Sequence, residues 1–200
     1  MVRILVVDRK DILSHYFQGF ISKELFDFTT GLKRSYYKER ELVENDPEIK
    51  QLIPYVIIRR NDRFLVYQRA RDSSKYKEKR LQALWSVGIG GHVDEPEDVL
   101  QTAIREIREE IGLEVEVSRL IEKGYINDDS NSVGRVHFGI VYELHLTNNE
   151  KIRLGEEIAR YTFVDKEKLI EMYNDPKIRF EGRSNILVPV VVYSSFKNNI

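Results

Sequence analysis

The sequence contains no cysteine and only five prolines among its 200 residues. Without cysteine the chain can form no disulfide bond, no thiolate nucleophile and no cysteine-ligated zinc site. This absence is typical of proteins from a reducing compartment, so we expect the chain to work in the cytoplasm. Disulfide staples are also unnecessary, because 200 residues with 42% hydrophobic content suit one domain of ordinary to generous size.

The sequence also lacks an excess of charge of one sign and any long apolar run. The 32 basic and 33 acidic side chains give a formal net charge of −1, whereas a broad nucleic-acid surface is normally strongly basic. The apolar stretch in MVRILVVD is too short for the core of a signal peptide or for a membrane span, and no later run is long enough. We therefore expect no nucleic-acid partner and no membrane partner.

Hydrophobic periodicity predicts regular elements along most of the chain. Strands are expected at residues 2–7, 56–60, 63–68, 85–89, 135–146 and 161–164, and a helix at 166–173. Asn61 and Asp62 would form a two-residue hairpin turn between the second and third of these strands. Apolar residues alternate along the strand at 135–146, which is typical of a strand buried on one face only.

Three segments allow more than one structure. Residues 11–28 are rich in spaced aromatics and fit either a helix or packed loops. Residues 38–50 are charged and helix-prone up to Pro47, so they are expected to form a connector. At residues 186–196 the β-branched residues favour a strand.

The most informative stretch is residues 91–113, GHVDEPEDVLQTAIREIREEIGL. Asp94 or Glu95 can cap a helix here, and Pro96 suits a first helical turn. Gly112 suits the left-handed position that follows a last turn. The sequence therefore predicts a helix with both of its ends marked.

Three glutamates share one face of this predicted helix. Glu106, Glu109 and Glu110 are three or four residues apart, so their side chains fall within roughly a third of the circumference. An exposed pair of like charges costs only a few tenths of a kcal/mol, but a cluster that converges on a cleft costs more, and a divalent cation removes that cost. The apolar residues form a separate stripe, displaced by roughly 120°, which can anchor the helix: Leu100, Ala103, Ile104, Ile107 and Ile111.

A helix rich in arginine and glutamate is more commonly a solvated surface helix with weak i,i+4 pairs, such as Arg105 with Glu109. The spacing of the whole segment favours the metal site instead, because it is similar to the Nudix box, G-x5-E-x7-R-E-U-x-E-E-x-G-U with U a bulky aliphatic residue. Every position of that pattern is met: Gly91, Glu97, Arg105, Glu106, Ile107, Glu109, Glu110, Gly112 and Leu113. The chain therefore resembles the Nudix hydrolase family.

This resemblance implies an α/β fold, the Nudix-type α/β/α sandwich with a mixed β-sheet. Residues 49–200 would form the Nudix hydrolase domain, and residues 1–48 an N-terminal extension packed on it as a strand plus helix or loop. The resemblance also favours a packed final helix, rather than a strand, for the C-terminal segment.

The resemblance further implies a hydrolase that uses Mg²⁺, or alternatively Mn²⁺, to cleave the diphosphate bond of a nucleoside diphosphate linked to another moiety. Water activated by the metal would be the nucleophile. By resemblance, Glu106, Glu109, Glu110 and the carbonyl of Gly90 would bind the metal. Many members of the family dimerise, so a homodimer is one expected assembly.

Other box residues are given supporting roles by the same resemblance. Arg105 would orient the glutamates, and Gly91, Glu97 and Gly112 would shape the loop around the helix. The predicted catalytic set is Glu109, Glu110, Arg105 and Glu157.

Candidates outside the box are less specific. Arg69 and Arg80 lie in or beside a basic loop that suits a polyphosphate, although a solvated surface loop explains it equally well. Glu156 or Glu157, rather than a box glutamate, could serve as the general base, and both also fit ordinary surface charges.

Three histidine positions carry a weaker signal. His92 lies beside the glycine pair, and His137 and His145 share one face of the strand at 135–146. Lone histidines are more often surface residues or satisfied by a neighbour than catalytic.

Two further functions remain as alternatives. A non-catalytic nucleotide-binding or regulatory module would need neither three metal glutamates nor the orienting arginine. An isomerase-like activity is suggested by a similarity of residues 65–91 to isopentenyl diphosphate isomerase, but that enzyme depends on a cysteine and this chain has none. The sequence does not indicate which diphosphate is the substrate.

Overall fold

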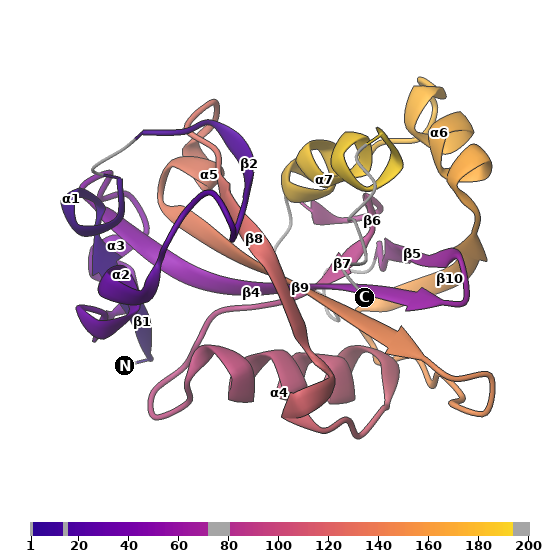
Figure 1. Cartoon of the computed structure of the whole chain (residues 1–200), viewed down its shortest axis with the longest axis horizontal. Helices are drawn as coiled ribbons and strands as arrows, with labels where there is room; N and C mark the ends of the chain where they lie inside the picture. Colours follow the sequence, from indigo (N-terminus) through magenta and orange to yellow (C-terminus); the bar gives the residue numbers. More distant parts are fainter. Residues whose placement is uncertain (1, 14–15, 72–80, 194–200) are drawn as a thin grey trace. The chain divides into compact units, whose positions relative to one another are not determined.

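The computed structural model in Figure 1 describes residues 2–13, 16–71 and 81–193. The chain divides into two compact units. The first unit comprises Met1–Tyr55, Gly90–Ala103 and Glu122–Tyr142, and the second unit comprises Val56–Ile89, Ile104–Ile121 and Glu143–Ile200. Strands β4 (Ile49–Arg60) and β9 (His137–Leu146) and helix α4 (Val99–Ile111) contribute residues to both units.

Antiparallel strand pairs organise the first unit. Strand β1 (Arg3–Asp8) pairs with β3 (Tyr36–Glu39) and with the start of β4, and β2 (Gly19–Ser22) pairs with β8 (Ile121–Asn127). Buried apolar side chains from these elements form a small core of Ile4, Val6, Val43 and Ile49. Short helices connect the strands: α1 (Arg9–Ile12), α2 (Thr29–Lys33), α3 (Arg40–Val43) and α5 (Ser132–Arg135).

Strand β5 (Arg63–Arg69) is central to the second unit. It pairs antiparallel with the end of β4, with β10 (Ile158–Val164) and with β6 (Trp85–Ser86). The short β7 (Gly88–Ile89) pairs with β4. Helices α6 (Lys166–Asn174) and α7 (Gly182–Tyr193) lie side by side (Figure 1), and the 3-10 turn η2 (Val117–Arg119) follows α4.

The predicted hairpin is confirmed, because Asn61 and Asp62 join β4 to β5 and Asn61 has the positive φ of 54° that such a turn requires. The prediction that the strand at 135–146 is buried on one face only is wrong. Val141 and Glu143, on the face expected to be open, are 0% and 1% exposed. Burial of the Glu143 carboxylate is tolerated because Arg59 forms an ion pair with it at 3.0 Å.

The segments that the sequence left open adopt short elements. Residues 11–28 contain the end of α1 and strand β2, and residues 38–50 contain only the four-residue α3 as helix. In the C-terminal segment, residues 186–193 belong to the helix α7, with Pro189 inside it, as the family resemblance implied, and the rest lies outside the described residues. The predicted division at residue 48 stays a prediction, although β1 pairs with strands from both sides of it.

Helix α4 begins later than its sequence suggested. Its start is fixed by Asp98, whose Oδ1 accepts from the Gln101 amide at 2.8 Å while the Asp98 amide donates to Gln101 Oε1 at 2.8 Å. This reciprocal pair is a capping box, so the expectation that Asp94 or Glu95 caps the helix, with Pro96 in its first turn, is wrong. At the other end Gly112 has φ +67°, which confirms the left-handed residue predicted there.

Candidate active site

Arg105 holds two of the three box glutamates. Its Nη1 lies 2.8 Å from Glu106 Oε1 and 3.1 Å from Glu109 Oε2, one turn further along α4. The side chain of Glu109 is 56% exposed, whereas that of Glu106 is only 14% exposed. Arg105 therefore pairs with both carboxylates, and its orienting role in a metal site stays a prediction.

Glu110 lies in a different environment, because its side chain is buried. Its Oε1 accepts from Arg69 Nη1 at 3.2 Å, and Arg69 Nε donates to Glu181 Oε2 at 3.2 Å. The other oxygen of Glu110, Oε2, is buried and has no hydrogen-bond partner among the residues that the structure describes. A buried acceptor left without a partner costs about 1–3 kcal/mol, so another group that binds there would be stabilising.

Burial also changes the acidity of these glutamates. Loss of solvent, followed by the repulsion of Glu110, raises the pKa of Glu106 to about 7. Burial likewise raises the pKa of Glu110, with Arg69 opposing that rise and the charge of Glu157 adding to it. The raised pKa values mean that burial disfavours the charged forms of these carboxylates, and a cation beside them would stabilise those forms.

The loop at residues 153–157 lies against the end of α4. The Arg153 amide donates to the Ile111 carbonyl at 2.9 Å, and the Gly155 amide donates to the Glu110 carbonyl at 2.9 Å. A Cβ at Gly155 would lie only 2.1 Å from the Glu109 carbonyl oxygen. Gly155 was not predicted from the sequence. The available signal for this close approach was a glycine two residues before Glu157.

Glu157 is fixed by its backbone to the end of β5, because its carbonyl accepts from the Ala70 amide at 2.8 Å. Its charge contributes to the raised pKa of Glu110, which places the two carboxylates in the same electrostatic environment. Glu156 is exposed. Of the two candidates for a general base, Glu157 is thus the one brought into electrostatic contact with the box.

In the first unit, the loop before α4 is tightly packed. A Cβ at Gly90 would lie 1.9 Å from the Pro54 carbonyl oxygen, so only glycine fits there. Gly91 follows it in the chain, and Glu97 Oε2 accepts from Thr102 Oγ1 at 2.8 Å. The contact between Glu97 and Thr102 links the loop to the first turn of α4. The supporting role expected for Glu97 stays a prediction.

Two of the histidines meet in this unit. His137 Nδ1 lies 2.6 Å from the Val133 carbonyl, so Nδ1 carries a proton and Nε2 of the neutral ring is an acceptor. His92 Nε2 lies 3.2 Å from that atom and 2.8 Å from Gln51 Oε1. The sequence named both histidines separately, but their contact depends on the strand pairing and was not predicted.

Of the two predicted substrate contacts, Arg69 and Arg80, the structure describes only Arg69. Arg69 is only 2% exposed and its guanidinium is engaged by Glu110 and Glu181. Arg80 lies outside the described residues. A direct contact of either arginine with substrate stays a prediction.

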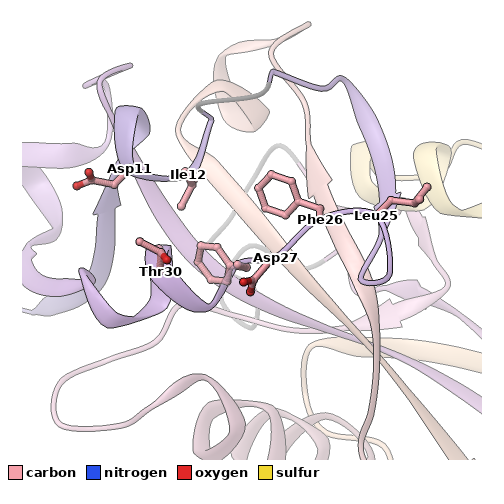
Figure 2. A pocket seen from close by; sticks show the side chains of 8 residues that line it. Asp11, Ile12, Leu25, Phe26, Asp27 and Thr30 are labelled. Carbon is pink, nitrogen blue, oxygen red and sulfur yellow. The ribbon is translucent and has the colours of Figure 1, made fainter.

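A pocket of about 380 Å³ lies among residues 11–31 in the first unit (Figure 2). Phe26 and Phe28 contribute apolar rings to its wall, and Asp11 and Asp27 contribute carboxylates. Among the described residues, its lining contains no lysine, arginine or histidine, and the two carboxylates would repel a diphosphate. The pocket is therefore not a candidate for the anionic part of a substrate.

The donor set of α4 fits a hard divalent cation. All candidate side-chain ligands are carboxylate oxygens, which Mg²⁺ and Mn²⁺ prefer, and Glu110 Oε2 is an unused acceptor among them. Within residues 2–13, 16–71 and 81–193, no three His, Asp or Glu side chains are already gathered as a ligand group. The glutamates are instead held as ion pairs by Arg105 and Arg69.

Comparison with known proteins identifies the family. The NUDIX domain model matches residues 50–183. Protein YmaB of Bacillus subtilis (strain 168) is 32% identical over 205 residues, which cover 94% of this chain and 96% of that protein. No helix in the part of the chain that the structure describes has the length and apolar character needed to cross a membrane.

Solved structures agree in fold. The crystal structure of Tm1382, a protein classed with the Nudix hydrolases, matches 96% of this chain and 98% of its own with 27% identity and a TM-score of 0.72. A bifunctional NMN adenylyltransferase/ADP ribose pyrophosphatase from Francisella tularensis, complexed with AMP and an Mn ion, covers 72% of this chain and 41% of its own. Its 17% identity and TM-score of 0.54 show a likeness of fold alone.

These findings confirm the predicted α/β fold of the Nudix type, with its mixed sheet and several helices. The family match covers the intact box, β5, β6, β7 and nearly all of β4 before it, and β8, β9 and β10 after it. The chain therefore belongs to the Nudix family and is a Nudix hydrolase, a pyrophosphohydrolase from a family that acts on nucleoside diphosphates linked to another moiety.

Proposed function

We propose that this enzyme uses Mg²⁺, with Mn²⁺ as an alternative, to hydrolyse the diphosphate bond of a small nucleoside diphosphate derivative. The proposed metal ligands are Glu106, Glu109, Glu110 and the carbonyl of Gly90. The observation that carries this proposal is the buried Glu110 Oε2, an acceptor that has no hydrogen-bond partner in the protein. A buried carboxylate oxygen is normally hydrogen-bonded or bound to another group.

The metal, when bound, would neutralise charge on the diphosphate oxygens and lower the pKa of a water molecule. The protein supplies position and proton transfer. Arg105 fixes the carboxylates of Glu106 and Glu109 through its two ion pairs, which limits the conformations they can adopt. Glu157 is the proposed general base, supported by its backbone bond to Ala70 and its electrostatic effect on Glu110.

The loop glycines and Glu97 are proposed to shape the site without touching the substrate. The close approach of residue 90 to Pro54 and the left-handed backbone at residue 112 both require glycine, and each would help to hold α4 in one orientation. Gly91 is proposed to act with them. Arg69 and Arg80 remain candidate substrate contacts, and Arg69 would first have to exchange a carboxylate for a phosphate.

We also propose that the enzyme works in the cytoplasm on a free small molecule, without nucleic-acid or membrane partners. The support is the absence of cysteine and the net charge of −1. A homodimer is one expected assembly, and sedimentation of the purified chain would measure the oligomeric state.

The activity is tested by a substrate screen with matched variants. Purified protein is incubated with Mg²⁺ or Mn²⁺ and nucleoside triphosphates, nucleotide sugars, dinucleoside polyphosphates, CoA or NADH, and products are separated by ion-exchange chromatography. Glu109→Gln and Glu110→Gln are each expected to lower turnover by about 10²-fold or more, because each removes a predicted ligand. Glu114→Gln changes an exposed glutamate just after the box and should leave turnover unchanged.

Two results would overturn the proposal. One is a wild-type protein that binds a nucleotide but cleaves none of the compounds with either metal, which would favour the binding or regulatory module. The other is a wild-type activity that both Gln variants in the box retain in full, because the predicted ligands would then be irrelevant to the chemistry.

A further inference from the structure

Glu181 is a buried carboxylate that the Nudix box does not include. Its side chain is 2% exposed. Glu181 Oε2 lies 3.2 Å from Arg69 Nε, and Glu181 Oε1 accepts from Ser86 Oγ at 2.9 Å. Both carboxylate oxygens are therefore satisfied, one by a guanidinium and one by a hydroxyl, so the group is held in a single orientation.

The backbone around Glu181 is fixed as firmly as its side chain. The Trp85 amide donates to the Arg179 carbonyl at 2.8 Å, and the Glu181 amide donates to the Trp85 carbonyl at 2.9 Å. Helix α7 starts at the next residue, and Ser184 Oγ in its first turn accepts from the Val87 amide at 3.0 Å. The start of α7 is thus bound to β6 on both sides of Glu181.

Arg69 connects Glu181 to the candidate metal ligand Glu110. Its Nε faces Glu181 and its Nη1 faces Glu110, each at 3.2 Å. Because a guanidinium is planar and rigid, the bond at Nε determines the direction of Nη1. Arg69 is then aimed at one oxygen of Glu110, Oε1, while Oε2 has no hydrogen-bond partner.

The unpartnered oxygen is the point at which a cation can reach this group. Arg69 Nη1 bonds Oε1 of Glu110, so a cation on Oε2 would bind the carboxylate oxygen that this bond leaves open. Carboxylate oxygen is the ligand type that hard divalent cations prefer.

We propose that Glu181 is a positioning residue of the metal site: it holds Arg69 so that Glu110 keeps one carboxylate oxygen for the cation. This inference rests on the proposed function, since it assumes that Glu110 binds the metal. Without the carboxylate of Glu181, Arg69 gains the freedom to bind both oxygens of Glu110 as a fork. That fork would occupy the metal-binding oxygen and neutralise its charge.

The test is the affinity of the full-length protein for Mn²⁺ alone, measured by electron paramagnetic resonance of the free ion. Glu181→Gln is expected to weaken binding about 10- to 100-fold, as is usual when a group behind a metal ligand is changed. Glu171→Gln is the matched control, because the side chain of Glu171 on α6 is 65% exposed and pairs with Lys168 of the same helix. Its affinity should equal that of the wild type.

A second variant and a second readout separate positioning from mere stabilisation. Ser86→Ala removes one support of Glu181 but keeps the carboxylate, so a loss of a few fold is expected, and this variant serves where Glu181→Gln fails to fold. The Mn²⁺-induced rise in melting temperature should shrink in both variants, most in Glu181→Gln. A structural role alone would lower the melting temperature equally with and without Mn²⁺.

The outcomes distinguish this inference from the proposed function. A wild-type protein that takes up no Mn²⁺ overturns both. If the wild type binds Mn²⁺ and both variants bind it with the same affinity, the inference about Glu181 is wrong and the proposed metal site stands. Weaker binding in Glu181→Gln, with the Glu171→Gln control unchanged, supports the inference.

Discussion

Replacing Glu110 by glutamine should remove most of the stabilisation that a divalent metal gives to this enzyme. The change is nearly isosteric, so α4 keeps its packing, but the amide is neutral and a poor ligand for a hard cation. A ligand that binds only the folded state at 100 times its dissociation constant stabilises by about 2.7 kcal/mol. For a chain of this size that corresponds to a rise in melting temperature of roughly 5–11 °C.

The metal-free effect of the same change should be small, because two contributions oppose each other. The bond from Arg69 is weakened by about 1–2 kcal/mol, because a neutral amide oxygen replaces a carboxylate oxygen as its acceptor, whereas removal of a buried charge recovers about as much. Arg69 keeps its bond to Glu181. We therefore expect the metal-free melting temperature of Glu110→Gln to lie within a few degrees of the wild type.

The assay is differential scanning calorimetry of the wild type, Glu110→Gln and the exposed control Glu114→Gln, each with EDTA and with saturating Mg²⁺ or Mn²⁺. The decisive quantity is the shift caused by metal within each protein, which cancels metal-free differences between them. A shift in Glu110→Gln as large as that of the wild type would refute the argument, because it would show that the buried oxygen plays no part in metal binding.

Three other perturbations test the structural claims. Asp98→Ala removes the capping box of α4 and should cost about 1 kcal/mol in the free energy of unfolding, measured with urea, while Asp98→Asn should cost less. Gly90→Ala places a Cβ 1.9 Å from the Pro54 carbonyl oxygen, so it should lower the free energy of unfolding by about 1–3 kcal/mol and reduce the activity. Unchanged stability would show that this approach is not tight. The bonds from Arg119, and then those from Thr147, lower the pKa of Glu150 from 4.5 to about 2. Because that folded-state pKa is depressed, Glu150→Gln should lose the most stability above about pH 4.5, and the loss should shrink as the pH falls toward 2. A difference in stability between wild type and variant that stays constant from pH 7 to pH 2.5 would contradict this explanation.

The local patterns of the sequence predicted those features that depend on neighbours in the chain. The hairpin turn at Asn61 and the left-handed Gly112 follow from residue types at fixed offsets. The contact of Arg105 with Glu109 follows from helical spacing. The start of α4 was misplaced because Asp94, Glu95 and Asp98 are all acceptable caps, and only the reciprocal bond with Gln101 selects among them.

Features that depend on strand register were not predictable from one sequence. His92 and His137 meet only because the strand that carries Gln51 lies beside Val136, whose carbonyl accepts from the Gln51 amide at 2.7 Å. Gly155 matters only because its loop lies on the end of α4. In each case the residue type was visible, but the partner lies 40 or more residues away along the chain.

Arg69 shows most clearly how a residue can be singled out from the sequence while its role stays open. Its place at the end of a strand beside a basic loop favours a phosphate contact. In the structure it bonds Glu110, from the box, and Glu181, which lies 112 residues away in sequence. Its bond to Oε1 of Glu110 leaves Oε2 as the oxygen that a cation can bind. A phosphate drawn to Arg69 before a metal is bound would add negative charge beside these carboxylates. We therefore expect metal binding at Glu110 to precede any contact between Arg69 and an anionic substrate.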